Sequence, residues 1–219
     1  MARGIHAACL AAALAAVGCA SVPTVPPDQE CLQQLRARGV AFSEGPSLHG
    51  VRTPVTLEGA RFTPRLSPRG TRAPEMDCRL AVALVDARPV FSKLGITSLE
   101  YSAAYDYRNR RRSNQLSQHA AGLAIDVHAF RTVEHEYVVA RAFERRGGRW
   151  RNAPPGPGWF QSCVGRPRTS GGTLLRRLAC RLRLEESLRL ILTPDDDRDH
   201  RDHFHIEARP DPLPPAATS

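Results

Sequence analysis

Lysine and long apolar runs are the scarcest features of this sequence. Lys93 is the only lysine among 31 basic residues, so arginine carries almost all of the positive charge behind the net charge of +9. The arginines are scattered and match no nucleic-acid-binding module, so we expect no nucleic-acid partner and only a general attraction to anionic envelope polymers. After residue 19 no apolar run approaches the 18 residues that indicate a membrane-spanning helix, which excludes a span there.

Two further absences bear on the fold and on metal chemistry. Helical and strand-like stretches do not alternate as regular βαβ units, and no internal repeat is present. This mixture favours an α+β domain with a small antiparallel sheet and flanking helices. No Cys-x-x-Cys pair occurs either, which argues against a zinc site built from thiolates.

The cysteines predict disulfides. Six are present, and two of them, Cys9 and Cys19, fall in the N-terminal segment. An even number remains, which in an exported chain predicts two disulfides with three possible pairings. Pairing within each half of the chain favours Cys31–Cys78 and Cys163–Cys180.

Residues 1–18 have the features of a lipoprotein signal peptide. Arg3 precedes an apolar run, Ile5 to Val17, which is too short to span a bilayer but suits a signal. The run ends in AAVGC, which resembles a bacterial lipobox and predicts cleavage before Cys19 and lipidation of that cysteine. We therefore expect an exported protein that is lipid-anchored in a bacterial envelope and faces the periplasm. An ordinary signal peptide cleaved near Ala20 is the alternative.

Proline-rich stretches bound the rest of the chain. Residues 19–27 are expected to form a tether and residues 210–219 a disordered tail, because proline favours extended, unpaired backbone. Residues 28–209 are long enough for one domain with a sizeable core.

Local patterns predict three helices and three strands in that domain, and residues 40–42 and 51–64 are expected to form short strands or extended loop. Helices are expected over residues 26–39, 73–95 and 173–190, the second interrupted at Pro89. Strands are expected over residues 96–105, 123–130 and 203–208. Strict alternation in the second strand places Ile125 and Val127 on one face and Asp126, His128 and Phe130 on the other.

Histidines recur near the C-terminus, in the stretch DDDRDHRDHFHI. His203 and His205 share one face of the expected strand, so both imidazoles can approach one metal ion. By itself a His-x-His pair is often only a polar strand face. The acidic residues of this stretch, Asp195 to Asp197, are expected to form a solvated turn.

A second stretch, SQHAAGLAIDVHAF, supplies further ligand types. Gly122 permits a tight turn that returns His119 toward Asp126. His119, Asp126 and one downstream histidine form an N,N,O set that leaves one tetrahedral position for water, as in catalytic zinc sites. The same set occurs in non-haem iron oxygenases, which export and disulfides argue against.

The residues SQHAAGLAID match the S-x-H-x-x-G-x-A-x-D signature of the LAS zinc peptidases, and HFH matches their C-terminal motif. That superfamily includes D-Ala-D-Ala carboxypeptidases, murein endopeptidases and the hedgehog signalling domain. Within it the chain most resembles bacterial extensin-like C-terminal domain proteins, from about Cys31 through Glu207. The resemblance implies a zinc site on the sheet of a hedgehog- or DD-peptidase-like fold.

The resemblance also implies residue roles. His119, Asp126 and His205 correspond to the zinc ligands, and His200 to a further active-site histidine of the murein endopeptidases. Dipeptidase-type members use a glutamate as base; no such glutamate occupies this position, so spacing assigns the base to His203. Arg108, in a run of four arginines, corresponds to an arginine that steadies substrate or oxyanion. Asp199 or Asp202 is expected to orient a ligating histidine.

The function expected from the resemblance is a zinc-dependent D,D-carboxypeptidase or endopeptidase acting on peptidoglycan stem peptides. The alternative is a non-catalytic module, stabilised by zinc, that binds the cell wall or a protein. The sequence leaves open the bond cleaved, the membrane that retains the protein and its oligomeric state.

Overall fold

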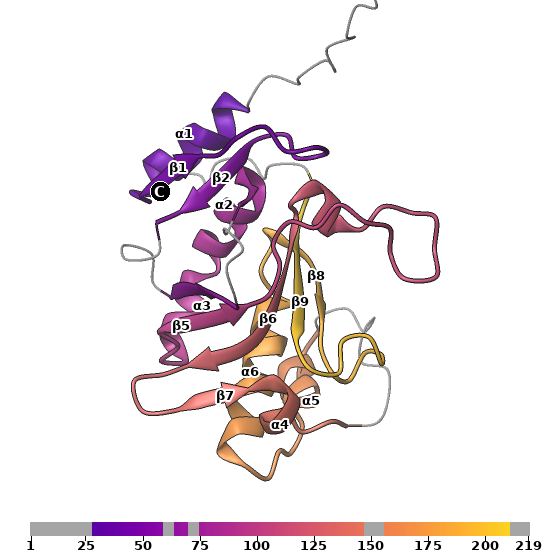
Figure 1. The fold of residues 1–219 in the computed structure, drawn as a ribbon. Helices are drawn as coiled ribbons and strands as arrows, with labels where there is room; N and C mark the ends of the chain where they lie inside the picture. Colours follow the sequence, from indigo (N-terminus) through magenta and orange to yellow (C-terminus); the bar gives the residue numbers. More distant parts are fainter. Residues whose placement is uncertain (1–27, 59–63, 70–74, 147–155, 211–219) are drawn as a thin grey trace, which may run out of the picture.

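The computed structural model describes residues 28–58, 64–69, 75–146 and 156–210 and shows helices packed on two β-sheets (Figure 1). The expected α+β class is confirmed. The predictions for the signal peptide, for Cys19, for the tether and for residues 211–219 of the tail lie outside the described residues. Within the described ranges, no helix is long and apolar enough to cross a membrane.

The smaller sheet joins the N-terminal segments. It is antiparallel, with order β1-β2-β4, from Phe42–Glu44, Pro54–Leu57 and Met76–Asp77. Helix α1 (Gln29–Ala37) begins after Asp28, whose side chain accepts a hydrogen bond from the Cys31 backbone N–H. The disulfide Cys31–Cys78 ties α1 to the start of α2 (Cys78–Asp86), as the sequence predicts.

The larger sheet has six strands and corrects the expectation of a small antiparallel sheet. Its order is β3-β5-β6-β9-β8, and β7 also pairs with β6. The strands are β3 (Arg65–Pro68), β5 (Ser98–Tyr101), β6 (Ala124–Arg131), β7 (Glu136–Val138), β8 (Leu188–Leu192) and β9 (Phe204–Ala208). Strands β3 and β5 are parallel and the other pairs are antiparallel, so the sheet is mixed.

The helices depart from the predicted bounds where capping or proline decides. Residue Met76, predicted helical, lies in β4, and the buried side chain of Asp77 caps the start of α2 (Cys78–Asp86). Helix α3 (Arg88–Lys93) follows as a separate segment with Pro89 in its first turn, which is the predicted interruption. The helix predicted over residues 173–190 is shorter at its C-terminal end: α6 spans Ser170–Leu182, and residues from Leu188 onward form β8.

Two short helices and a second disulfide complete the C-terminal half. Helices α4 (Val139–Ala142) and α5 (Trp159–Val164) precede α6. The predicted disulfide Cys163–Cys180 joins α5 to α6. Two disulfides are typical of proteins that fold in an oxidising, exported environment.

The core lies on one face of the larger sheet. Leu84 of α2 and Leu178 of α6 belong to the same buried cluster as Ile125, Val127 and Phe204 of the strands. Because side chains alternate along a strand, Asp126 and His205 are turned to the opposite face. The fold therefore sets the polar residues of β6 and β9 on a rigid sheet backed by packed apolar side chains.

A bulge in β6 places Phe130 on the opposite face of the sheet from the one that the sequence predicts. The register with β5 runs from Glu100↔Ala129 to Tyr101↔Val127, which leaves His128 as an extra residue. An extra residue exchanges the faces of the residues beyond it. Phe130 is therefore fully buried and packs on Phe204, instead of sharing the face of Asp126.

Candidate metal centre

The loop before β6 holds His119 in place. The short 3-10 helix η1 (Gln118–Ala121) begins after Ser117, whose hydroxyl accepts a hydrogen bond from the His119 backbone N–H. It ends at Gly122, which has φ +66°, and the Gly122 carbonyl accepts from the Asp77 backbone N–H at 3.0 Å. A Cβ at residue 122 would lie 2.7 Å from that nitrogen, so both the turn and the contact require glycine.

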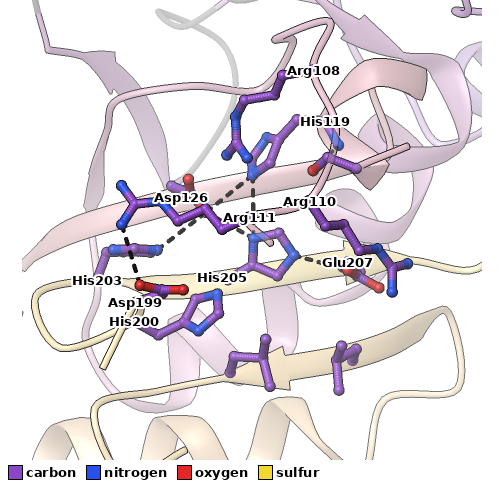
Figure 2. Close-up of a pocket in the computed structure, with 13 residues that line it drawn as sticks. Arg108, Arg110, Arg111, His119, Asp126, Asp199, His200, His203, His205 and Glu207 are labelled. Carbon is purple, nitrogen blue, oxygen red and sulfur yellow. Dashed lines mark hydrogen bonds and ion pairs between the residues drawn. The ribbon is translucent and has the colours of Figure 1, made fainter. Parts of the chain in front are cut away.

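Strands β6 and β9 bring the two sequence motifs together. Asp126 and His205 are directly paired in the antiparallel register, and His205 Nδ1 lies 2.8 Å from Asp126 Oδ1. His119 Nε2 lies 3.2 Å from His205 Nδ1 and 3.2 Å from Asp126 Oδ1. These distances show that the structure places the three predicted ligands in one cluster (Figure 2). All three residues are buried.

Electrostatics in the cluster favour a carboxylate anion and a bound cation. Burial raises the pKa of Asp126, but hydrogen bonds from His119 and His205 more than offset this and hold the pKa far below its usual range. Burial lowers the pKa of His205, yet the hydrogen bonds to Asp126 and Glu207 raise it to about 9. At neutral pH Asp126 is therefore ionised, and His205 carries a proton where no metal ion takes its place.

The donor set fits zinc. Two imidazole nitrogens and one carboxylate oxygen are ligand types that zinc prefers, and donors bound tetrahedrally to one zinc ion lie about 3.3 Å from each other. The observed separations of 2.8 to 3.2 Å are close to that value. His119, Asp126 and His205 can therefore hold one zinc ion with little movement.

Glu207 is a site residue that the sequence analysis missed. Its carboxylate accepts a hydrogen bond from His205 Nε2 at 2.9 Å, which leaves Nδ1 of the neutral ring with its lone pair toward the cluster. Glu207 is itself paired with Arg189. The signal was present in the sequence, because Glu207 stands two residues after His205 and therefore on the same face of β9.

His119 has no such support. Its Nδ1 is buried and has no hydrogen-bond partner among the described residues. The backbone turn between Ser117 and Gly122 therefore decides where this ring points, whereas a carboxylate orients the ring of His205.

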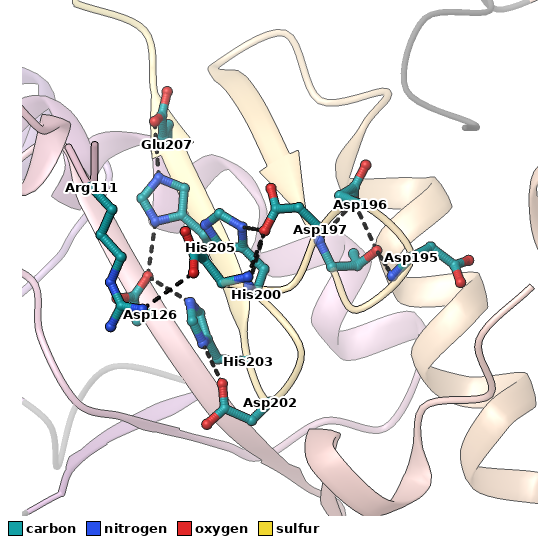
Figure 3. Close-up of polar contacts among 12 residues, drawn as sticks. Arg111, Asp126, Asp195, Asp196, Asp197, His200, Asp202, His203, His205 and Glu207 are labelled. Atoms are coloured by element: carbon teal, nitrogen blue, oxygen red, sulfur yellow. Dashed lines mark hydrogen bonds and ion pairs between the residues drawn. The ribbon is translucent and has the colours of Figure 1, made fainter. Parts of the chain in front are cut away.

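The other two histidines of the C-terminal motif, His200 and His203, lie beside the cluster. Asp202 accepts a hydrogen bond from His203 Nδ1 at 2.9 Å, and His203 Nε2 lies 3.5 Å from Asp126 Oδ1 (Figure 3). His200 Nδ1 lies 2.6 Å from Asp197 Oδ1, and the ring centroid of His200 is 5.2 Å from that of His203. Burial lowers the pKa of His200, so this imidazole is neutral near pH 7.

The acidic residues near His200 correct two expectations. Asp199 pairs with Arg111 at 3.2 Å and orients no ligating histidine; Asp202 orients His203, which is outside the three-ligand cluster. The predicted turn is present, but it is not solvated at Asp195 and Asp196, whose side chains are buried against Arg176 and Arg183. These ion pairs fasten the segment before β9 to α6.

A cavity of about 310 Å³ opens onto the cluster. Arg108, Arg110 and Arg111 line it together with the histidines, and its walls also contain the carboxylates of Asp126, Asp199 and Glu207 (Figure 2). Arg108 is held by Asp106 at 2.9 Å, and its side chain is 42% exposed. The cavity thus leaves the cluster accessible to a small anionic or peptide ligand.

The comparisons with known proteins concern mainly the first of the two motifs. Residues 29–153, more than half of the chain, match the family described as extensin-like protein C-terminus. This match includes His119 and Asp126, whereas the three clustered histidines of the last motif follow it. No curated protein and no solved structure matches the chain.

Proposed function

The chain belongs to the extensin-like protein C-terminus family, and from this premise we propose that it is a zinc-dependent peptidase that cleaves peptidoglycan stem peptides in the cell envelope. The observation that carries the proposal is the meeting of two motifs, 79 residues apart, at the hydrogen bond between Asp126 and His205. Both motifs resemble those of the LAS zinc peptidases, which supplies the reaction class and the substrate class.

The protein's part in metal binding rests on three side chains. His119 Nε2, Asp126 Oδ1 and His205 Nδ1 would hold the ion, and Glu207 would keep His205 in the tautomer that binds it. When bound, zinc lowers the pKa of a coordinated water and polarises the scissile carbonyl.

His203 is the proposed general base. With Asp202 accepting its Nδ1–H, the Nε2 atom of the neutral ring is free to take a proton from water at the site. The same nitrogen can then donate that proton to the leaving amine. Its distance of 3.5 Å from Asp126 Oδ1 puts Nε2 beside the ligand cluster.

The arginines of the cavity wall, together with His200, supply the remaining proposed roles. Arg108, Arg110 and Arg111 line the cavity and would attract the carboxylates of a peptide substrate. An arginine close to the reacting carbonyl would also stabilise negative charge that develops on its oxygen. His200, neutral through burial, would offer a hydrogen bond to the bound peptide.

One distance favours the second candidate function, a non-catalytic module stabilised by zinc. His203 Nε2 is near enough to the cluster that a small rotation would make it a fourth protein ligand. Four protein ligands close a zinc site, as in structural centres. In that case the cavity with its three arginines would serve to bind wall peptides without cleaving them.

His203→Ala separates the two functions. In a peptidase the variant keeps about one zinc ion per chain and loses cleavage of purified muropeptides; in a closed structural site it loses zinc affinity instead. His135→Ala, at a side chain 63% exposed in the β6–β7 turn, is the matched control. Zinc retained by the unaltered protein with no hydrolysis of any wall peptide would reject the peptidase.

Attachment to the envelope through Cys19 is part of the proposal. Its support is the lipobox-like AAVGC and the two disulfides. Cys19→Ser should move the protein from the membrane to the soluble periplasmic fraction and abolish labelling by radioactive fatty acid. Unchanged fractionation and labelling would reject the anchor while leaving the metal centre untouched.

A further inference from the structure

A second set of metal-ligand types lies beside the first. His128, Asp202 and His203 each offer one donor atom, and these atoms all lie within 4.8 Å of one another. The Asp202 side chain is 48% exposed and that of His203 is 12% exposed, so an ion from solvent can reach the group from the side of Asp202. Within the part of the chain that the structure describes, this is the one other group of histidine, cysteine and acidic residues with such spacing.

Features already described bring these donors together. The bulge in β6 makes His128 the extra residue, and Asp202 and His203 form the turn that enters β9. The ring centroids of His128 and His203 are 5.2 Å apart, and Asp202 Oδ1 is 2.9 Å from His203 Nδ1.

We propose that His128, Asp202 and His203 bind a second divalent transition-metal ion, such as zinc, with lower affinity than the His119–Asp126–His205 cluster. Two imidazoles and a carboxylate are suited to zinc. The affinity is lower for two reasons. The donors are more exposed, and the positive charge of Arg69 acts on His128 although Arg69 is paired with Glu100 at 2.8 Å.

The second ion would inhibit the enzyme, a consequence that rests on the proposed function. His203 belongs to both sites, because Nδ1 faces Asp202 and Nε2 faces Asp126. An ion held by both Asp202 and His203 would take up the carboxylate that orients the His203 ring. His203 could then no longer serve as the proposed general base.

Zinc binding to the purified full chain tests the site itself. Calorimetric titration of the metal-free protein with zinc should resolve a tight step and a weaker step. His128→Ala and, independently, Asp202→Asn should weaken the second step about tenfold or more and leave the first in place, because each removes one of three ligands. His119→Ala should weaken the first step and keep the second.

Different results would reject the second metal site and the inhibition of the proposed peptidase. His135→Ala should bind zinc like the unaltered protein, and circular dichroism verifies that each variant is folded. A single binding step at all zinc concentrations, or two unchanged steps in both His128→Ala and Asp202→Asn, would overturn the second site.

Hydrolysis of muropeptides should fall at zinc concentrations that fill the weaker step, and at about tenfold higher concentrations in His128→Ala. Two steps without any hydrolysis would keep the site and reject only the proposed function.

Discussion

His205 lies directly opposite Asp126 in the β6–β9 pair, with Nδ1 of the imidazole 2.8 Å from Oδ1 of the carboxylate. We expect the register between β6 and β9 to be strongly specified. A shift of β9 by one residue would turn the buried side chains of Phe204 and Ile206 to the polar face of the sheet. The apolar core therefore fixes the geometry of the candidate metal centre.

Glycine at residue 122 should matter for metal binding as well as for stability. Gly122→Ala places a Cβ against the Asp77 backbone nitrogen at φ +66°, so we expect the turn to shift and His119, which no second hydrogen bond orients, to move with it. Zinc affinity should fall at least tenfold, as for loss of a ligand-orienting contact. Equilibrium dialysis with zinc measures this.

Gly95→Ala is the matched control. Gly95 has φ +68°, but a Cβ there meets nothing within 4 Å. This variant should lose about 1 kcal/mol of unfolding free energy through backbone strain alone and keep its zinc affinity. Equal zinc affinities in the two glycine variants would show that the Gly122 turn does not position His119.

Glu207→Gln should weaken zinc binding about 10- to 100-fold while the fold is retained. The amide still accepts a hydrogen bond from His205 Nε2, but it lacks the charge that makes Nδ1 a stronger donor to the metal. Glu136→Gln, at a carboxylate paired with Arg131 outside the cavity, is the control. Unchanged affinity in Glu207→Gln would mean that the carboxylate serves only Arg189.

Zinc affinity should depend steeply on pH. The pKa of His205 is raised to about 9 in the metal-free protein, so below that pH a proton must leave before Nδ1 binds zinc. The apparent affinity should therefore rise about tenfold per pH unit from pH 7 and level off above about pH 9. Calorimetry in buffers of different ionisation enthalpy should show about one proton released per zinc at pH 7. A pH-independent affinity with no proton release would contradict the protonated His205.

The two disulfides should contribute unequally to stability. Cys31–Cys78 closes a longer segment, with a sequence separation of 47, than Cys163–Cys180 with a separation of 17. Loop-closure entropy then predicts losses of about 4 and about 3 kcal/mol on replacing the respective pairs by serine. Urea unfolding of the two double variants measures the difference; a larger loss from the Cys163 and Cys180 pair would contradict the entropic account.

Spacing predicted that His119 and Asp126 approach each other with one downstream histidine, because the glycine turn and the alternation along β6 define where the first two side chains point. The choice of His205 came from the resemblance to the LAS motifs. Both disulfide pairings followed from the division of the chain into halves, and the α+β class from the absence of regular alternation.

The parts that the sequence did not predict depend on contacts between distant segments. The bulge at His128 is a mismatch between β5 and β6, and no pattern within β6 reveals it. The parallel pairing of β3 with β5 is likewise a tertiary property. Asp195 looked like part of an exposed acidic run because its partner, Arg176, stands in α6.

The most direct test of the metal centre is a crystal structure of the zinc-loaded protein with anomalous data at the zinc absorption edge. We predict a strong peak bonded at about 2.0 to 2.2 Å to His119 Nε2, His205 Nδ1 and an oxygen of Asp126. A zinc-loaded crystal with no peak among these three side chains would contradict the account.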